Sequence, residues 1–216
     1  MALDYEHTEL TGISFSRDMP MPELERRKSG RQITIYRTAT IRVGAFHGLC
    51  LIRNISAGGL MGTVHTTLPV SANVAIEIDS DNAISGKIIW TKDLLIGVQF
   101  DQPIDVNQIL QRRSEESKGR THRMPRLNIT CGARVLVSGA SREVTIHDIS
   151  QGGARLEAEF LRMGDQVTVA IYGLGTSRGV VCWSDNGNAG ISFDTPIAFN
   201  QLAAWASRQG AGEKRE

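Results

Sequence analysis

Two short polar segments share a pattern of residues that could bind a ligand. They read RNISAGGL (Arg53–Leu60) and HDISQGGA (His147–Ala154). Each has an amide or carboxylate, a hydroxyl and a glycine, at Asn54, Ser56 and Gly59 in the first segment and at Asp148, Ser150 and Gly153 in the second. The polar groups offer hydrogen bonds, and glycine lets a backbone approach a ligand closely. A structural role is also open, in which the paired glycines adopt positive φ and the serine bonds the backbone of a tight turn.

Basic segments precede both polar turns. Residues 24–31 contain Arg26, Arg27, Lys28 and Arg31 against one acidic residue, and residues 111–126 contain six basic residues against two acidic ones. A guanidinium group binds phosphate oxygens, and also guanine O6 and N7, through two hydrogen bonds at once. Together, the arginines and the polar turns indicate a site for a purine nucleotide with phosphodiester groups.

The polar turns belong to a longer internal repeat. VQFDQPIDVNQIL (Val98–Leu110) matches ISFDTPIAFNQLA (Ile191–Ala203), and GKIIW (Gly86–Trp90) matches GVVCW (Gly179–Trp183). The copies lie 93 or 94 residues apart along the chain. A unit of about 90 residues has therefore been duplicated, and 216 residues is a length that suits two such domains.

Each unit reads as short strands followed by a helix. The expected strands are rich in β-branched residues: ITIYRTATIRV, LCLIRNI, VAIEI, GKIIW and IGVQF in the first unit, and ARVLV, EVTIHDI, QVTVAIY, GVVCW and AGISF in the second. Helix-like segments at Asp105–Arg113 and Ala198–Arg208 begin shortly after a proline. We predict an all-β protein of two small antiparallel β-barrels in tandem, each closed by a C-terminal helix.

The predicted organisation has five parts. They are an N-terminal extension at 1–24, a first domain at 25–113, a linker at 114–119, a second domain at 120–208 and a C-terminal tail at 209–216. The charged stretch RRSEESKGRTHR shows no apolar period, which is typical of a linker.

The ordered motifs resemble those of the PilZ domain family. Arg27 and Arg31 fit Arg-x-x-x-Arg with Arg26 in front, and NISAGG fits Asp/Asn-x-Ser-x-x-Gly about 20 residues later. PilZ domains are small β-barrels that serve as receptors for the bacterial second messenger cyclic di-GMP. The resemblance implies a signalling receptor or adaptor without enzymatic activity or cofactor, which changes conformation on binding cyclic di-GMP and passes the signal to a protein partner.

By this resemblance, the first repeat holds the ligand through Arg26, Arg27, Arg31, Asn54, Ser56 and Gly59. The second repeat offers a possible second site at Arg126, Asp148, Ser150 and Gly153. That repeat departs from the arginine motif, because the residue four positions before Arg126 is His122, whose neutral imidazole cannot replace a guanidinium fork. We therefore expect one sensor repeat and one structural or partner-facing repeat.

Two further features have alternative interpretations. Trp90 could face a guanine in the first repeat, or it could pack on the barrel or helix, as could its counterpart Trp183. The segment GLGTSRG (Gly173–Gly179) superficially resembles a dinucleotide-binding loop, but it lacks the third glycine and lies between two strand patterns. We interpret it as a hairpin turn.

The composition disfavours other classes of protein. Cys50, Cys131 and Cys182 have no paired spacing and lie in or beside apolar runs, so we expect reduced, buried thiols; the five histidines form no ligand pairs. No apolar run is long enough to cross a membrane and the N-terminus lacks a signal-peptide pattern, so we expect a cytoplasmic protein with no membrane insertion. The alternatives are a PilZ-like adaptor that binds only proteins and, less favoured because the rest of the chain is acidic, a nucleic-acid-binding barrel.

Overall fold

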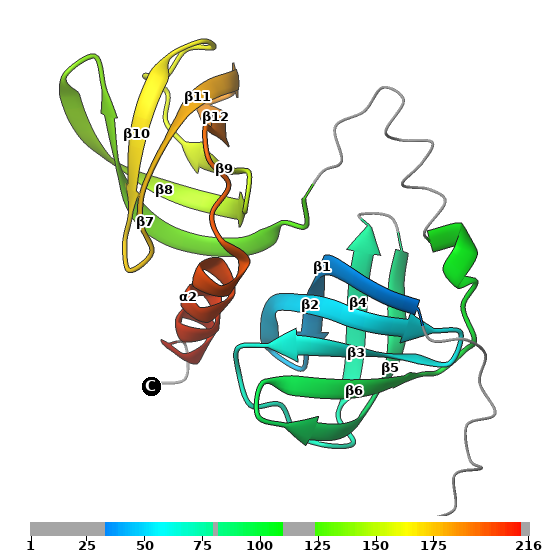
Figure 1. Ribbon diagram of the computed structural model, residues 1–216. Coiled ribbons are helices and arrows are strands. Elements are labelled where there is room, and N and C mark those ends of the chain that lie inside the picture. Colours follow the sequence, from blue (N-terminus) through cyan, green and yellow to red (C-terminus); the bar gives the residue numbers. More distant parts are fainter. Residues whose placement is uncertain (1–32, 80–81, 110–123, 213–216) are drawn as a thin grey trace, which may run out of the picture.

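The structure is a computed structural model that describes residues 33–79, 82–109 and 124–212 (Figure 1). These residues form two closed barrels, each of six antiparallel strands, and a C-terminal helix. The predicted fold class is confirmed. The boundaries predicted for the extension, linker and tail stay predictions, and the linker 114–119 lies outside the described residues.

The first barrel contains strands β1 to β6 in the order β1-β2-β3-β6-β5-β4, and β4 closes it against β1. The bounds are β1 (Ile33–Val43), β2 (Phe46–Ser56), β3 (Gly59–Val64), β4 (Asn73–Asp79), β5 (Asn82–Lys92) and β6 (Leu95–Phe100). The second barrel repeats this topology, with β10 closing against β7. Its bounds are β7 (Leu127–Val137), β8 (Ala140–Ser150), β9 (Gly153–Glu157), β10 (Gln166–Ile171), β11 (Gly175–Asp185) and β12 (Asn188–Phe193).

The repeat extends to the irregularities of the strands. The register between β2 and β3 shifts between Ile52 and Asn54, and the register between β8 and β9 shifts between Ile146 and Asp148. Bulges at such positions re-aim side chains and bend a strand. The duplicated unit therefore places its polar turn on the same backbone geometry in both copies.

Period-2 alternation of side chains fills the barrel interiors. On β7, Ala133 and Val135 are fully buried. Arg134 and Leu136, which alternate with them along the strand, face outward and are exposed. Each barrel thus encloses an apolar core of its own, and alternation is what separates inner from outer residues. The hairpin predicted for GLGTSRG is confirmed, because Tyr172–Leu174 joins β10 to β11 and Gly173 and Gly175 have positive φ.

The predicted C-terminal helix is α2 (Phe199–Gly212). Leu202, Ala203, Trp205 and Ala206 are buried in the core of the second barrel. In the first repeat, residues 106–109 are helical, and an Asp105 carboxylate oxygen accepts hydrogen bonds from the amides of Asn107 and Gln108 at 2.9 and 3.2 Å. Asp105 is thus an N-cap, and the rest of the helix predicted to reach Arg113 lies outside the described residues.

The three cysteines are free thiols in different surroundings. Burial raises the pKa of Cys50 to about 12 and that of Cys131 to about 11. Cys182 is exposed, so the expectation of a buried thiol was wrong at that position. The residue lies next to Trp183 at a register shift of β11, where an apolar strand residue is turned toward solvent.

Candidate functional site

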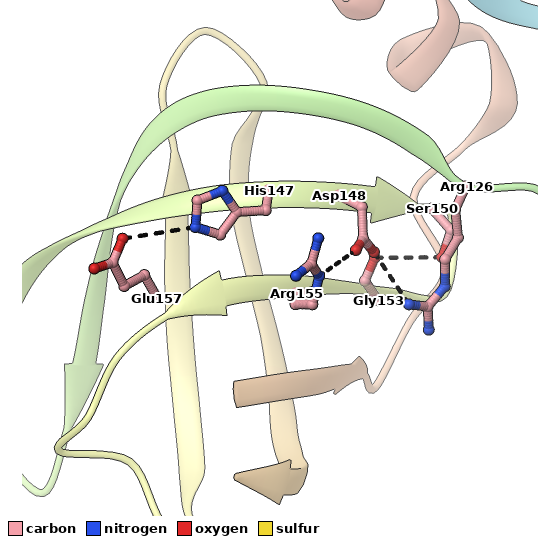
Figure 2. A network of polar contacts seen from close by, with 7 residues as sticks. All are labelled: Arg126, His147, Asp148, Ser150, Gly153, Arg155 and Glu157. Atoms are coloured by element: carbon pink, nitrogen blue, oxygen red, sulfur yellow. Dashed lines mark hydrogen bonds and ion pairs between the residues drawn. The ribbon is translucent and has the colours of Figure 1, made fainter. Parts of the chain in front are cut away.

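The two polar turns have the same internal bond. Ser56 Oγ donates to the carbonyl of Gly59 at 3.2 Å, and Ser150 Oγ donates to the carbonyl of Gly153 at 3.3 Å (Figure 2 shows the second). Both serines are buried. The predicted role of the serine in holding its turn is confirmed, and only the acceptor lone pairs of the hydroxyl remain for a ligand.

The prediction of positive φ at the paired glycines was wrong. The described glycines with positive φ lie in other turns, and none of the four glycines at 58–59 and 152–153 is among them. Gly59 and Gly153 are required for another reason: a Cβ on Gly59 would overlap the carbonyl oxygen of Val98, and one on Gly153 would overlap that of Ile191. The glycine at the end of the motif lets β3 approach β6, and β9 approach β12.

This close approach gives a testable contrast between neighbouring glycines. We expect Gly153→Ala to lower the free energy of unfolding by about 1–3 kcal/mol, because the added methyl group must push two backbones apart. Gly152→Ala should be close to neutral, since its Cβ would meet only the sulfur of Met124 at 3.6 Å, an ordinary contact. Urea unfolding of the two variants measures the difference, and equal midpoints would contradict this explanation.

Asn54 lies in a row of outward-facing residues that crosses five strands of the first barrel. Strand pairing aligns Thr34 with Asn54, Asn54 with Met61, Met61 with Gly97 and Gly97 with Trp90. Neighbouring strands are about 4.8 Å apart, so the row is about 20 Å long. It presents an amide, a thioether and an indole on one outer face, which suits contact with a planar base and its polar edge.

Trp90 packs outside the barrel rather than in its core. A Cβ on Gly97 would overlap the indole nitrogen of Trp90, which shows that the ring lies over that glycine. Trp183 lies over Gly190 in the same way, and the two tryptophans are 38% and 39% exposed. One ring face is thus used for packing, and Trp90 shares the outer face with Asn54.

In the second repeat the same row carries a network of ion pairs (Figure 2). Asp148 is buried, and its carboxylate accepts from Arg126 Nη1 at 3.1 Å and from Arg155 Nε at 2.6 Å. Arg155 stands where the first repeat has Met61, and the row continues to Gly190 and Trp183. Both carboxylate oxygens of Asp148 therefore have partners within the protein.

Strand register also revises the counterpart of Arg126. β7 begins at Leu127 as β1 begins at Ile33, and both residues pair with the isoleucine of the polar motif. In the sequence Gln32 directly precedes Ile33, as Arg126 directly precedes Leu127, so Arg126 corresponds in sequence position to Gln32 and Pro125 to Arg31. The second repeat has no arginine at the sequence position that corresponds to Arg31.

Arg26, Arg27 and Arg31 lie outside the described residues. Arg31 is three residues before Thr34, which pairs with Asn54. The arginine motif is therefore close in sequence to the strand residue that pairs with Asn54.

Sequence reasoning missed Met61 and Arg155. Each stands two residues after the last glycine of its motif. Because side chains alternate along a strand, a residue at that position lies on the same face as Asn54 or Asp148, the first residue of the motif. Within the described residues, no cluster of histidine, cysteine or carboxylate side chains is arranged to bind a metal ion. No described helix combines the length and apolar character required to cross a membrane.

Comparisons with known proteins identify similar domains in both halves of the chain. The family model for the PilZ domain matches residues 25–116 and 111–206. Similar solved structures include the Borreliella burgdorferi PlzA protein in complex with c-di-GMP (18% identity, 82% of this chain and 94% of that chain, TM-score 0.37). Escherichia coli YcgR in complex with c-di-GMP shares 11% identity over 82% of this chain and 86% of its own, with a TM-score of 0.35. Bacillus subtilis MotI, an inhibitor of motility, shares 15% identity over 85% of this chain and 100% of its own, with a TM-score of 0.33. Among curated proteins, no relative matched the sequence.

Proposed function

The chain belongs to the PilZ domain family in both repeats, and from this premise we propose that it is a non-enzymatic receptor for cyclic di-GMP. The proposed binding residues are those of the first repeat: Arg26, Arg27, Arg31, Asn54, Ser56 and Gly59. On binding, the protein changes conformation and passes the signal to a protein partner.

One observation supports this assignment most strongly. Thr34, which follows Arg31 by three positions along the chain, pairs with Asn54 of the polar turn, so the arginine motif immediately precedes the strand that lies beside the turn. The guanidinium groups supply forks for phosphate and for guanine O6 and N7, and the Asn54 amide can both donate and accept. The row toward Trp90 offers an apolar surface beside these polar groups.

In the second repeat, the possible site at Arg126, Asp148, Ser150 and Gly153 is a weaker candidate. Its carboxylate is bound by Arg126 and Arg155, which themselves remain 46% and 40% exposed. A ligand that used Asp148 would have to displace an ion pair of the protein. We therefore assign nucleotide binding to the first repeat alone.

Titration calorimetry with three nucleotides tests the proposal. We expect cyclic di-GMP to bind at least about 10- to 100-fold more tightly than cyclic di-AMP or GTP, because an arginine fork matches the two acceptors of guanine, whereas adenine presents a donor there. GTP lacks the second guanine and the cyclic phosphodiester. Equal affinity for all three would contradict the assignment, and no binding of any would favour an adaptor that acts only through protein partners.

A further inference from the structure

The two barrels contact each other through surfaces that are not equivalent in the two repeats. The clearest sign is Leu49 on β2, which is 2% exposed and belongs to the hydrophobic cluster of the second barrel rather than its own. In Figure 1, α2 lies between the second barrel and β2 of the first. Leu49 is thus an apolar anchor that inserts from one repeat into the other.

The same position in the second barrel is charged. Leu49 pairs with Thr40 on β1, and its register counterpart Glu143 pairs with Arg134 on β7. Glu143 Oε1 lies 2.6 Å from Arg134 Nη2, and both side chains are more than half exposed. One face of the duplicated barrel has therefore become an apolar contact in the first repeat and a solvated ion pair in the second.

The polar turn of the second repeat, which contains Gln151, completes this contact. Thr38 Oγ1 on β1 donates to Gln151 Oε1 at 3.2 Å, and Gln151 Nε2 donates to the carbonyl of Ile197 at 3.0 Å. Gln151 follows Ser150 of the motif, and its counterpart in the first repeat is Ala57, which lacks these polar atoms. The side-chain amide of Gln151 therefore joins the turn to β1 of the first barrel through its oxygen and to its own barrel through its nitrogen.

The beginning of α2 adds a third contact. His65, which follows β3, lies 3.3 Å through Nε2 from Asn200 Oδ1, and its ring centroid is 6.1 Å from that of Phe199. The contact thus combines an apolar anchor, a bonded turn and the N-terminal turn of a helix, all on one side of the second barrel.

We propose that these surfaces form a dedicated docking interface, in which the polar turn of the second repeat positions the first barrel. The interface is heterologous, because different patches of two related domains meet. In the part of the chain that the structure describes, Thr34 is exposed and Asn54 is half-buried, and both lie at the other end of the β1–β2 pair from Leu49. This role goes beyond nucleotide binding and does not depend on it.

Leu49→Glu in the full chain tests the interface without the ligand. The substitution installs the residue that the second barrel carries at this strand position, outside its core, and it places a carboxylate in the contact. We expect a larger radius of gyration by small-angle scattering and a loss of the common rotational correlation time of the two barrels in NMR relaxation. Leu136→Glu, at an exposed site on β7, is the matched control and should change neither.

Gln151→Ala separates the role of the turn from that of the anchor. We expect a shift in the same direction as Leu49→Glu, because the bond to Thr38 is lost while the barrel cores are unchanged. If Leu49→Glu left the radius of gyration and the correlation time as in the unmodified chain, the docking role would be refuted. If only Gln151→Ala left them unchanged, the role of the turn would be refuted. Neither result would bear on cyclic di-GMP binding.

Discussion

Replacing Arg31 by alanine in the intact chain should weaken cyclic di-GMP binding about 10- to 100-fold. A bidentate arginine contact to guanine or phosphate contributes on the order of 1–3 kcal/mol, and 1.4 kcal/mol corresponds to a factor of ten in Kd. Arg27→Ala should have a similar effect, since it removes the other arginine of the motif. Titration calorimetry on the folded variants measures both effects. If both arginines are replaced together, the two losses of binding free energy should not add fully, because neighbouring contacts to one ligand are coupled.

Arg126→Ala is the matched control for these arginine variants. Its guanidinium binds Asp148 at 3.1 Å, and its sequence position relative to the following strand corresponds to Gln32 rather than to Arg31. We expect the Kd of the Arg126→Ala variant for cyclic di-GMP to stay within about twofold of that of the unmodified chain, a change in binding free energy below about 0.5 kcal/mol. If Arg126→Ala weakened binding as much as Arg31→Ala, the assignment of the ligand to the first repeat would be wrong.

The barrels could be predicted from sequence because most of their strands carry a clear local signal. β1 matches the expected segment ITIYRTATIRV from end to end, since its apolar residues alternate and turn residues bound it. β3 and β9 were not identified. They are short, they begin at the glycine of the motif, and they exist because β6 and β12 pair with them, which is a tertiary effect that local propensity does not reveal.

The candidate site was predictable only in part, for a similar reason. Asn54 and Ser56 stand in a recognisable motif, but the partnership of Asp148 with Arg155 depends on the register between two strands. That register contains a bulge, which shifts the pairing by one residue and cannot be located from composition. The role of Leu49 was equally hidden, because LCLIRNI reads as an ordinary buried strand and does not show which barrel each apolar side chain enters.

The glycines show how a correct observation can have a different cause. The pairs at 58–59 and 152–153 were expected to supply positive φ, whereas the structure uses Gly59 and Gly153 for close contact between strands. Both explanations predict glycine at the same position. Only the position of the neighbouring carbonyl oxygens, which belongs to the assembled barrel, distinguishes them.

Trp205→Ala should lower the free energy of unfolding of the second barrel by about 3–5 kcal/mol, the range for truncating a buried tryptophan. Trp205 is fully buried, and its indole nitrogen donates to the carbonyl of Tyr172 at 2.9 Å, so the variant loses packing and leaves that carbonyl without its indole donor. Trp183→Ala in the same barrel is the control. Its ring is 39% exposed over Gly190, so we expect a loss of about 1 kcal/mol or less.

Urea unfolding followed by circular dichroism distinguishes the two tryptophan variants. Because α2 also contacts β2 of the first barrel, Trp205→Ala should additionally release the docking of the two barrels, whereas Trp183→Ala should preserve it. Trp205→Phe retains much of the buried ring but not the hydrogen bond, and its midpoint should fall between those of the unmodified chain and Trp205→Ala. Equal midpoints for Trp205→Ala and Trp183→Ala would show that the buried face of α2 does not hold the second barrel together.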